Sequence, residues 1–342
     1  MRALVFLLFV LLNFDEIQSV KEIPRCAKAE FRTDAAFQAL VNPMYAHDND
    51  KPGPHEIYVD KTNWYKENKL FYVEPALLNK PSYQALLKVL KVYYGEATAS
   101  SWDEVFDPFL DAMMGSNPFV QLVGFFKKCE HPWFTEPTGT DAEGKEISRR
   151  DHIKAILKDL WFTPKYSGGG IGLRAFTHVF VGEVRHESNE ASGLHNWLSF
   201  YYRERLKNNP IVFTETLTNW WFDVVTTVAF KIPTATQKTF DKRATGILTI
   251  TSPAFDFALY TAAVMFRGSA GEETKVTPIT ILDCRVDIYH GLLYEVGGEI
   301  KIRTAYPKPA YDKRPWPSPC KTNYDLRTGK TCPAPAAPAD GA

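Results

Sequence analysis

The sequence predicts an α+β fold, with a helical N-terminal lobe at residues 27–160 and a lobe of antiparallel β-strands at residues 161–306. Apolar residues recur at helical spacing through the first lobe, whereas short runs rich in β-branched residues dominate the second. Helices that come first, followed by strands with few helices between them, are typical of α+β folds and not of repeated βαβ units. With 342 residues and 45% hydrophobic content, the chain can bury one large core or two smaller ones.

Apolar stripes at helical spacing predict the helices of the first lobe. The stripes are Leu86, Leu87, Leu90, Tyr93 and Tyr94; Val105, Phe106, Phe109, Leu110 and Met113; Phe119, Leu122, Val123 and Phe126; and Ile153, Ile156, Leu157 and Leu160. Pro81 and Pro118 suit the first turn of a helix, whereas Pro108 within the second stripe indicates a kink or a late start. We interpret these side chains as core residues without chemistry.

Strand-like runs fill the second lobe, at residues 224–230, 247–250, 276–282 and 300–304. One helix interrupts them, with Ser252 as its N-cap and Pro253 in its first turn. This helix is apolar nearly all round, so we expect it to be deeply buried. Three consecutive glycines at residues 168–170 predict a flexible turn, because the Lys-Ser/Thr ending of a phosphate-binding P-loop is missing.

The two ends of the chain carry signals of their own. Arg2 precedes an apolar run at residues 3–12, and the neighbours of Ser19 suit a cleavage point, so residues 1–19 predict a secretory signal peptide. That run is too short to span a bilayer. We therefore expect a secreted, extracellular protein that is soluble and has no membrane partner. The Pro- and Ala-rich residues 307–342 predict a disordered tail.

Charge and cysteine content narrow the class of protein. Lys plus Arg and Asp plus Glu number 40 each, which argues against a broad basic surface for nucleic acid but allows a local basic groove. The five cysteines belong to a chain that we expect in an oxidising compartment. Cys320 and Cys332 form the favoured pair because the loop between them is short, and Cys26 with Cys129 is a second candidate. One cysteine then stays free or pairs between chains.

Two histidines define the candidate catalytic centre. His178 lies in a run of β-branched and aromatic residues that predicts a strand, and His195 lies at the approach to a helix that begins near Trp197. The polar residues 186–192 between them suit a turn. Imidazole changes charge between about pH 5 and 8, so such a pair can supply the base and the acid of one reaction. Two hydrogen-bonded structural histidines fit the same spacing.

The same stretch contains a longer motif, His-Val-Phe-x-Gly-Glu, then a short polar loop, then Gly-x-His-Asn-Trp and Phe-Tyr. Its residues are His178, Val179, Phe180, Gly182, Glu183, Gly193, His195, Asn196, Trp197, Phe200 and Tyr201. This motif resembles the core signature of the EndoU family of uridylate-preferring endoribonucleases. The resemblance implies a hairpin that brings the two histidines together.

Two later blocks extend the resemblance, which covers residues 58–306 and implies an EndoU-like domain at residues 27–306. Residues 252–260 resemble the family block Ser-Pro-x-Phe-(Glu/Asp)-Phe-Ala-Leu-(Tyr/Phe). Counting back from it implies Lys242 as the catalytic lysine, with Lys238 as the reserve. The family's Thr-Ala-Tyr strand is matched by residues 304–306, which implies contacts of Thr304 and Tyr306 with uracil and phosphate.

The resemblance implies an enzyme that cleaves single-stranded RNA at uridylates by attack of the 2'-hydroxyl, which leaves a 2',3'-cyclic phosphate. His195 would act as base, His178 as acid and Lys242 as the cation that stabilises the phosphorane, although acid and base could be exchanged. We expect no DNA substrate and a monomeric protein. Thr245 is a further candidate for substrate binding, standing in for a small polar residue that the family often carries after its lysine.

Glu183 and Asn196 are supporting residues in this hypothesis. Glu183 would orient a histidine or assist a divalent ion, but in an ideal strand it points away from the face that holds His178. The resemblance implies Mn²⁺ as cofactor. However, Thr177 replaces a glutamate that usually precedes the family's first histidine, which predicts a reduced or altered metal requirement and leaves the metal ligands unknown.

Three alternatives remain open from the sequence. The first is a secreted RNA-binding protein with the same fold and impaired catalysis, which Thr177 favours. The second is a metal hydrolase that uses His178, His186, His195 and Glu183, although no His-Glu-x-x-His motif supports it. The third is a structural or signalling module whose histidines are merely buried.

Overall fold

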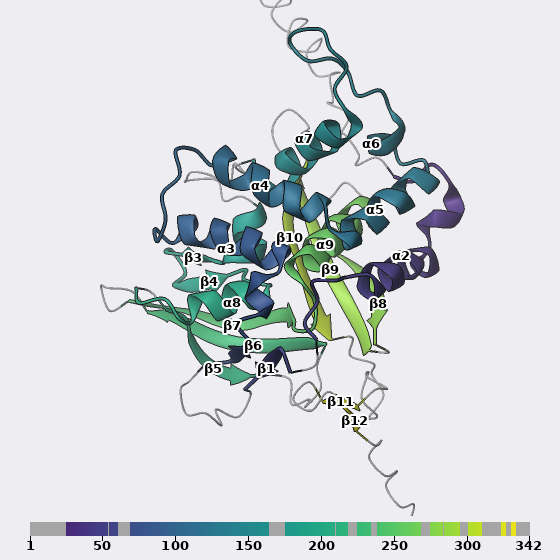
Figure 1. The fold of residues 1–342 in the computed structure, drawn as a ribbon. Coiled ribbons are helices and arrows are strands. Elements are labelled where there is room, and N and C mark those ends of the chain that lie inside the picture. The colour runs from purple at the N-terminus through teal and green to yellow at the C-terminus, as the bar shows by residue number, and fades with distance from the viewer. Residues whose placement is uncertain are drawn as a thin grey trace, which may run out of the picture.

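The computed structural model describes residues 25–53, 55–60, 69–163, 175–208, 210–217, 224–233, 238–267, 274–282, 284–294 and 300–309, and two short strands at 323–325 and 330–332. Two β-sheets, one of five strands and one of three, lie in the second half of the chain, and helices from the first half cover them (Figure 1). The predicted α+β class is confirmed.

Each predicted apolar stripe forms a helix. The helices are α3 (Pro81–Tyr93), α4 (Asp103–Met114), α5 (Asn117–Lys128) and α7 (Arg149–Phe162). Pro81 and Pro118 lie in first turns as predicted. Of the two alternatives predicted for Pro108, a kink or a late start, the late start is wrong, because α4 begins at Asp103 and runs through Pro108. The stripes pack toward the common core, with Leu90, Phe109 and Leu122 fully buried.

The first half also contains elements that the stripes did not indicate. They are η1 (Ala29–Arg32), α2 (Asp34–Ala46), β1 (Ile57–Val59), β2 (Phe71–Val73), η2 (Leu77–Asn79) and α6 (Pro132–Thr135). The hydroxyl of Thr33 accepts a hydrogen bond from the Ala36 amide and caps α2. Because α2 packs against β8, the helical half and the β-rich half share one core.

The five-stranded sheet has the order β3-β4-β7-β6-β5. Its strands are β3 (Glu183–Arg185), β4 (Glu190–Ser192), β5 (Val212–Thr216), β6 (Val225–Pro233) and β7 (Thr239–Leu248). The pairs are antiparallel except for β4 with β7, which meet in parallel. The predicted strands at 224–230 and 247–250 correspond to β6 and to the end of a longer β7.

The three-stranded sheet has the order β10-β9-β8, with both pairs antiparallel. Its strands are β8 (Lys275–Ile281), β9 (Cys284–Tyr294) and β10 (Ile300–Pro309). Strand β9 was not predicted, although its sequence carries the signal, because buried Cys284, Val286 and Ile288 alternate with more exposed polar residues. A bulge lies between residues 302 and 304 of β10, and the residues on both sides of it pair regularly with β9.

Helix α9 (Pro253–Arg267) lies at the centre of the molecule. It contacts the four helices α2 to α5 on one side and β8, β9 and β10 on the other. Its side chains from Pro253 to Phe266 are buried, so the predicted deep burial is confirmed. The hydroxyl of Ser252 accepts the amide hydrogen of Phe255 and donates to the Asp48 carboxylate, which anchors the helix start to the N-terminal half.

The two sheets meet where β7 passes β10. A Cβ atom built at Gly246 of β7 would lie 1.8 Å from the carbonyl oxygen of Pro307, so only glycine permits this approach. The approach brings Tyr306 of β10 beside the N-terminal end of α8 (Trp197–Arg203). The candidate catalytic residues gather at this junction.

The disulfide predictions have different outcomes. Cys26 and Cys129 are disulfide-bonded, which confirms the second candidate pair. Cys284 is also disulfide-bonded, so it is not the cysteine left over. The predicted pair of Cys320 with Cys332 lies outside the residues whose side chains are described.

Several terminal and loop predictions fall on undescribed parts of the chain. The signal peptide at residues 1–19, the glycine turn at 168–170 and most of the tail at 307–342 lie there. Within that tail, β10 extends to Pro309, and β11 (Asn323–Asp325) pairs with β12 (Lys330–Cys332). Among the helices of the described residues, none combines the length and the apolar character needed to cross a bilayer.

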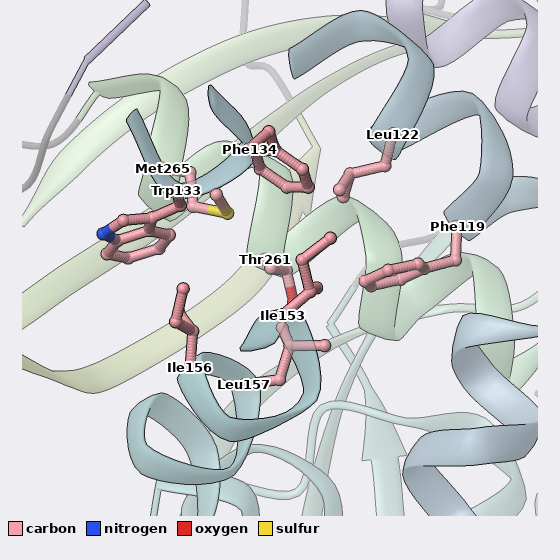
Figure 2. Close-up of a pocket in the computed structure, with 9 residues that line it drawn as sticks. All are labelled: Phe119, Leu122, Trp133, Phe134, Ile153, Ile156, Leu157, Thr261 and Met265. Carbon is pink, nitrogen blue, oxygen red and sulfur yellow. The ribbon is translucent and has the colours of Figure 1, made fainter. Parts of the chain in front are cut away.

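An apolar pocket lies between α5, α6, α7 and α9 (Figure 2). Side chains from all four helices line it: Phe119, Leu122, Trp133, Phe134, Ile153, Ile156, Leu157, Thr261 and Met265. No lining residue is charged, and the Thr261 hydroxyl is occupied by Trp161 Nε1, which donates to it at 3.0 Å. The pocket is therefore part of the helical core and holds none of the predicted catalytic residues.

Candidate active site

His178 lies on a π-helical turn, Thr177–Val181, and not on the predicted strand. The β-branched residues Val179 and Val181 favoured an extended backbone, but both side chains are fully buried, and packing against the core overrides that local preference. The turn closes with the hydrogen bond from the Gly182 amide to the Thr177 carbonyl at 2.8 Å. Isolated π-helical turns are rare and occur frequently at functional sites.

The π-helical turn brings His178 and Glu183 together. The two residues are five positions apart, which is the spacing of a π-helical hydrogen bond. Gly182, with a φ of +80°, then leads the chain into β3. His178 Nδ1 lies 3.0 Å from Glu183 Oε1, with 6% of the Glu183 side chain exposed. The separation of these two side chains expected for a strand does not occur.

The predicted hairpin between the two histidines is present. Strands β3 and β4 pair, and the chain then returns past the π-helical turn, where the Leu194 amide donates to the His178 carbonyl and the His195 amide donates to the Val179 carbonyl. These bonds hold the imidazole rings of His178 and His195 with centroids 6.0 Å apart. The structure therefore brings together two side chains separated by the whole loop.

The ring of His195 is held from behind by β7. Its Nδ1 lies 3.1 Å from the Gly246 carbonyl oxygen and 2.9 Å from the Thr245 hydroxyl. Because a carbonyl only accepts hydrogen bonds, Nδ1 carries the proton and Nε2 of the neutral ring is an acceptor. The Thr245 oxygen lies within hydrogen-bonding distance of protonated Nδ1, and its own single hydrogen is directed to the carbonyl oxygens of Gly193 and Leu194, at 3.1 and 2.8 Å. Thr245 therefore positions the ring of His195, and its contact with substrate stays a prediction.

A bulge in β7 places Lys242 on the same face as Thr245. Residues three apart in a regular strand point to opposite faces. Here Val228 pairs with Thr245 and Phe230 pairs with Lys242, so β7 contains one residue more than β6 across this stretch. Since Val228 and Phe230 share a face, their partners do too. Lys242 consequently lies on the side of β7 that holds His195. In agreement with this placement, the charge of Lys242 lowers the pKa of His195.

Thr304 and Tyr306 lie on the adjoining sheet and share one face of β10. The Tyr306 ring stacks on His195, with centroids 4.7 Å apart and planes inclined by 19°. Part of the Tyr306 surface is thus occupied by an imidazole. The Thr304 hydroxyl oxygen is buried and has no hydrogen-bond partner among the described residues. An unpaired buried hydroxyl costs free energy unless a ligand satisfies it.

Residues 36–307 match the protein family described as Endoribonuclease XendoU. The chain belongs to this family. It is 27% identical over 286 residues to uridylate-specific endoribonuclease C of Xenopus laevis, covering 77% of this chain and 87% of that protein. It is 26% identical over 262 residues to the uridylate-specific endoribonuclease of Paralichthys olivaceus, covering 69% of this chain and 60% of that protein. The EndoU resemblance is confirmed.

The fold of this XendoU-family chain is similar to that of a solved relative. The solved structure of XendoU, described as a splicing-independent snoRNA processing endoribonuclease, superposes with a TM-score of 0.58 at 21% identity. The match covers 79% of this chain and 95% of that structure. The two proteins therefore share one arrangement of helices and sheets.

Burial and neighbouring cations set the charge states in the XendoU-family site. Burial, Lys242, His178 and Lys308 lower the pKa of His195 well below the usual 6.5. Burial and the charges of Arg185 and Lys308 lower the pKa of Lys242 to about 8, against the opposing effect of Glu183 and Glu190. At neutral pH, His195 is uncharged and Lys242 is largely protonated.

Helix α9 supports His195 from the core side. Asn196 caps α8, since its side-chain oxygen accepts from the Ser199 amide at 3.1 Å, and its amide donates to Asp256 at 2.8 Å. Tyr260 donates to the His195 carbonyl at 3.3 Å. Asn196 thus links the start of α8 to α9. Asp256 and Tyr260 were not identified from the sequence as residues that support His195. Burial raises the pKa of Asp256 to about 8.

We expect Asp256→Asn to change how stability depends on pH. Because burial raises the pKa of the folded Asp256 carboxyl above its unfolded value, its contribution to stability is present below about pH 4 and is lost as pH rises toward about 8. The amide cannot ionise. We therefore expect wild type to lose free energy of unfolding between pH 5 and pH 8, and the variant to lose less. Urea unfolding of both proteins at the two pH values measures this difference. An equal difference at both values contradicts the assignment.

The described residues do not form a recognisable manganese site. Mn²⁺ favours octahedral sets of carboxylate, carbonyl and water oxygens. Within the described ranges, no three His, Cys, Asp or Glu side chains lie close enough together to hold a metal ion. Glu183 Oε1 is engaged by His178, and the position before His178 is held by Thr177, which is 8% exposed. These donors do not fit a resident Mn²⁺.

Proposed function

We propose that this chain is an endoribonuclease that cleaves single-stranded RNA at uridylates by attack of the 2'-hydroxyl, leaving a 2',3'-cyclic phosphate. One observation carries the proposal. The imidazole rings of His195 and His178 lie 6.0 Å apart and have different partners, since His195 contacts a neutral backbone carbonyl and His178 contacts the Glu183 carboxylate. The names of the relatives, uridylate-specific endoribonucleases, agree with it.

His195 acts as the general base in this mechanism. Its Nε2 takes the proton of the 2'-hydroxyl as the 2'-oxygen forms a bond to phosphorus. His178 acts as the general acid and donates a proton to the departing 5'-oxygen as the phosphorus–oxygen bond breaks. The Glu183 carboxylate accepts a hydrogen bond from His178 Nδ1 and so orients the ring for this transfer. Lys242 stabilises the additional negative charge on the phosphorane oxygens. No water molecule is consumed in this step.

Thr304 is our proposed reader of uracil. Its buried hydroxyl can accept from the ring N–H or donate to a carbonyl of uracil, so binding satisfies a group that has no partner among the described residues. Tyr306 borders the same face of β10 and holds the base near His195. We further propose that residues 1–19 direct secretion of the enzyme, as their sequence pattern predicts.

The direct test is cleavage of a short RNA that contains one uridine by the purified mature protein. We expect uridine-dependent cleavage with cyclic phosphate ends, detected by mass spectrometry, and a matched RNA with cytidine in place of uridine should be cut more slowly. RNA that is bound but never cleaved would overturn the proposal in favour of a non-catalytic RNA-binding protein.

The pH dependence should follow Lys242 and His195. With uridine 3'-(4-nitrophenyl phosphate), whose leaving group needs no acid, we expect the rate to hold its plateau to below pH 6.5, because His195 stays neutral there. The rate should fall above about pH 8 as Lys242 loses its proton. In Lys242→Arg the guanidinium stays charged, so the alkaline fall should disappear. An unchanged alkaline limb in that variant would assign it to another group.

We propose that activity does not depend on Mn²⁺, which follows from Thr177 and from the poor fit of the described donors. Enzyme treated with EDTA should keep its rate within about twofold, and added MnCl₂ should change little. Thr177→Glu restores a carboxylate next to His178 and is expected to increase the response to manganese. Loss of activity with EDTA that only Mn²⁺ restores would refute this proposal.

A further inference from the structure

Tyr289 and Lys308 form a surface with Tyr306 at the edge of the active site. Tyr289 of β9 pairs directly with Tyr306 of β10, and their rings stack with centroids 5.5 Å apart and planes inclined by 13°. Lys308 follows Tyr306 by two residues on the same face. Its ammonium group lies 4.5 Å from the Tyr289 ring centroid and 5.4 Å from that of Tyr306.

This surface continues the stack that begins at His195. One ring contact joins His195 to Tyr306, and the next joins Tyr306 to Tyr289. The stack therefore leads from the catalytic base along β9 and β10 toward the exposed Lys308. Tyr289 is partly exposed, and the catalytic steps do not use it.

The charge of Lys308 also reaches the catalytic centre. It contributes to lowering the pKa of both His195 and Lys242. A lysine that destabilises the charged form of Lys242 brings a cost in the free protein. Bound phosphate would offset this cost, because an anion interacts favourably with both ammonium groups.

We propose that Tyr289 and Lys308 form a subsite for the nucleotide next to the cleaved uridylate, with Tyr289 stacking on its base and Lys308 binding its phosphate. Such pairing of an aromatic ring with a nearby cation is how proteins bind single-stranded nucleic acid without reading its sequence. The exposed contact of Lys308 with the rings is weak, so phosphate can take up the ammonium group and free the ring. This inference rests on the proposed ribonuclease function.

The test compares two substrates that differ only in having a neighbouring nucleotide. One is an RNA hexanucleotide with a single uridine, and the other is uridine 3'-(4-nitrophenyl phosphate). We expect Tyr289→Leu and Lys308→Met each to lower kcat/KM on the hexanucleotide by about tenfold, as loss of one stacked base or one phosphate contact implies. On the ester at pH 7, where His195 is neutral and Lys242 is largely protonated, both variants should stay within about twofold of wild type.

Two control variants make the same chemical changes elsewhere. Lys231→Met removes an exposed lysine whose strand partner, Asp241, precedes Lys242 and points to the opposite face of β7. Tyr93→Leu removes an exposed tyrosine of α3. Neither control variant should lower kcat/KM on the hexanucleotide more than on the ester. For Lys308→Met, the plot of log kcat/KM for the hexanucleotide against log salt should also lose about 0.7 from its slope.

Other results would overturn the subsite. Equal losses on both substrates would mean that Tyr289 and Lys308 act through Tyr306 on His195, and no loss on the hexanucleotide would mean that no base binds there. If wild type cleaves neither substrate, the proposed function fails. Binding of a hexanucleotide with 2'-deoxyuridine then decides the subsite alone: a Kd weaker by about tenfold in the two variants upholds it, and an unchanged Kd refutes it.

Discussion

His195→Ala is expected to lower the rate of RNA cleavage by about 100- to 10,000-fold, which is the usual contribution of a general base. His195 is 4% exposed, and its ring is held by the Gly246 carbonyl, the Thr245 hydroxyl and the Tyr306 ring. Single-turnover cleavage of the single-uridine RNA measures the loss directly.

His290→Gln is the matched control for this variant. His290 is also buried, at 2% exposure, and contacts Thr277 within the three-stranded sheet, on the face opposite to Tyr289 and Tyr306. If loss of a buried histidine merely loosened the fold, both variants would lose activity and thermal stability together. We expect only His195→Ala to lose activity at a temperature where both remain folded. A comparable loss in His290→Gln would remove the case for His195 as base.

His178→Ala separates the roles of the two histidines. On RNA it should lose activity as severely as His195→Ala, because the departing 5'-oxygen needs a proton. On uridine 3'-(4-nitrophenyl phosphate) the loss should be small, because nitrophenolate leaves without protonation. If His195→Ala were the variant spared on the ester, the assignment of acid and base would be reversed.

Gly193→Ala is expected to disrupt the active site and the fold around it. A Cβ atom at residue 193 would lie 1.8 Å from the carbonyl oxygen of His178, and the backbone has a φ of +73°. The left-handed conformation costs an alanine about 1–2 kcal/mol. Relief of the overlap adds about 1–3 kcal/mol and must separate the two segments that carry the histidines. We expect loss of cleavage below detection and a clear decrease in melting temperature.

Gly139→Ala provides the control for backbone strain alone. Gly139 has a φ of +77°, but an added Cβ atom would meet no atom within 4 Å. This variant should lose only the conformational cost and keep full activity. If Gly193→Ala behaved in the same way, the close packing of residue 193 on His178 would not be what positions the catalytic pair.

Local pattern in the sequence predicted much of the architecture. Helical spacing of apolar residues located α3, α4, α5 and α7, because such a stripe reports which face of a helix is buried. The start of α9 was located by Ser252 as N-cap and Pro253 in the first turn. The predicted strand-like runs missed β9, although buried and more exposed residues alternate along it as expected for a strand. The strand prediction for His178 was wrong because it relied on the β-branched neighbours of this residue. The π-helical turn is selected instead by the burial of those neighbours in the core, which local sequence does not show.

By itself, the sequence determined the α+β class, the family and the residues that the family signature marks. Only the tertiary structure decided how they meet. The π-helical turn joins His178 to Glu183, the bulge in β7 turns Lys242 to the face of Thr245, and the approach of Gly246 to Pro307 sets Tyr306 against His195. The physical reason is range. Periodicity reports burial over a few residues, whereas these arrangements depend on how separate segments pack together, as where Thr245 and Gly246 hold the ring of His195 from about 50 residues further along the chain.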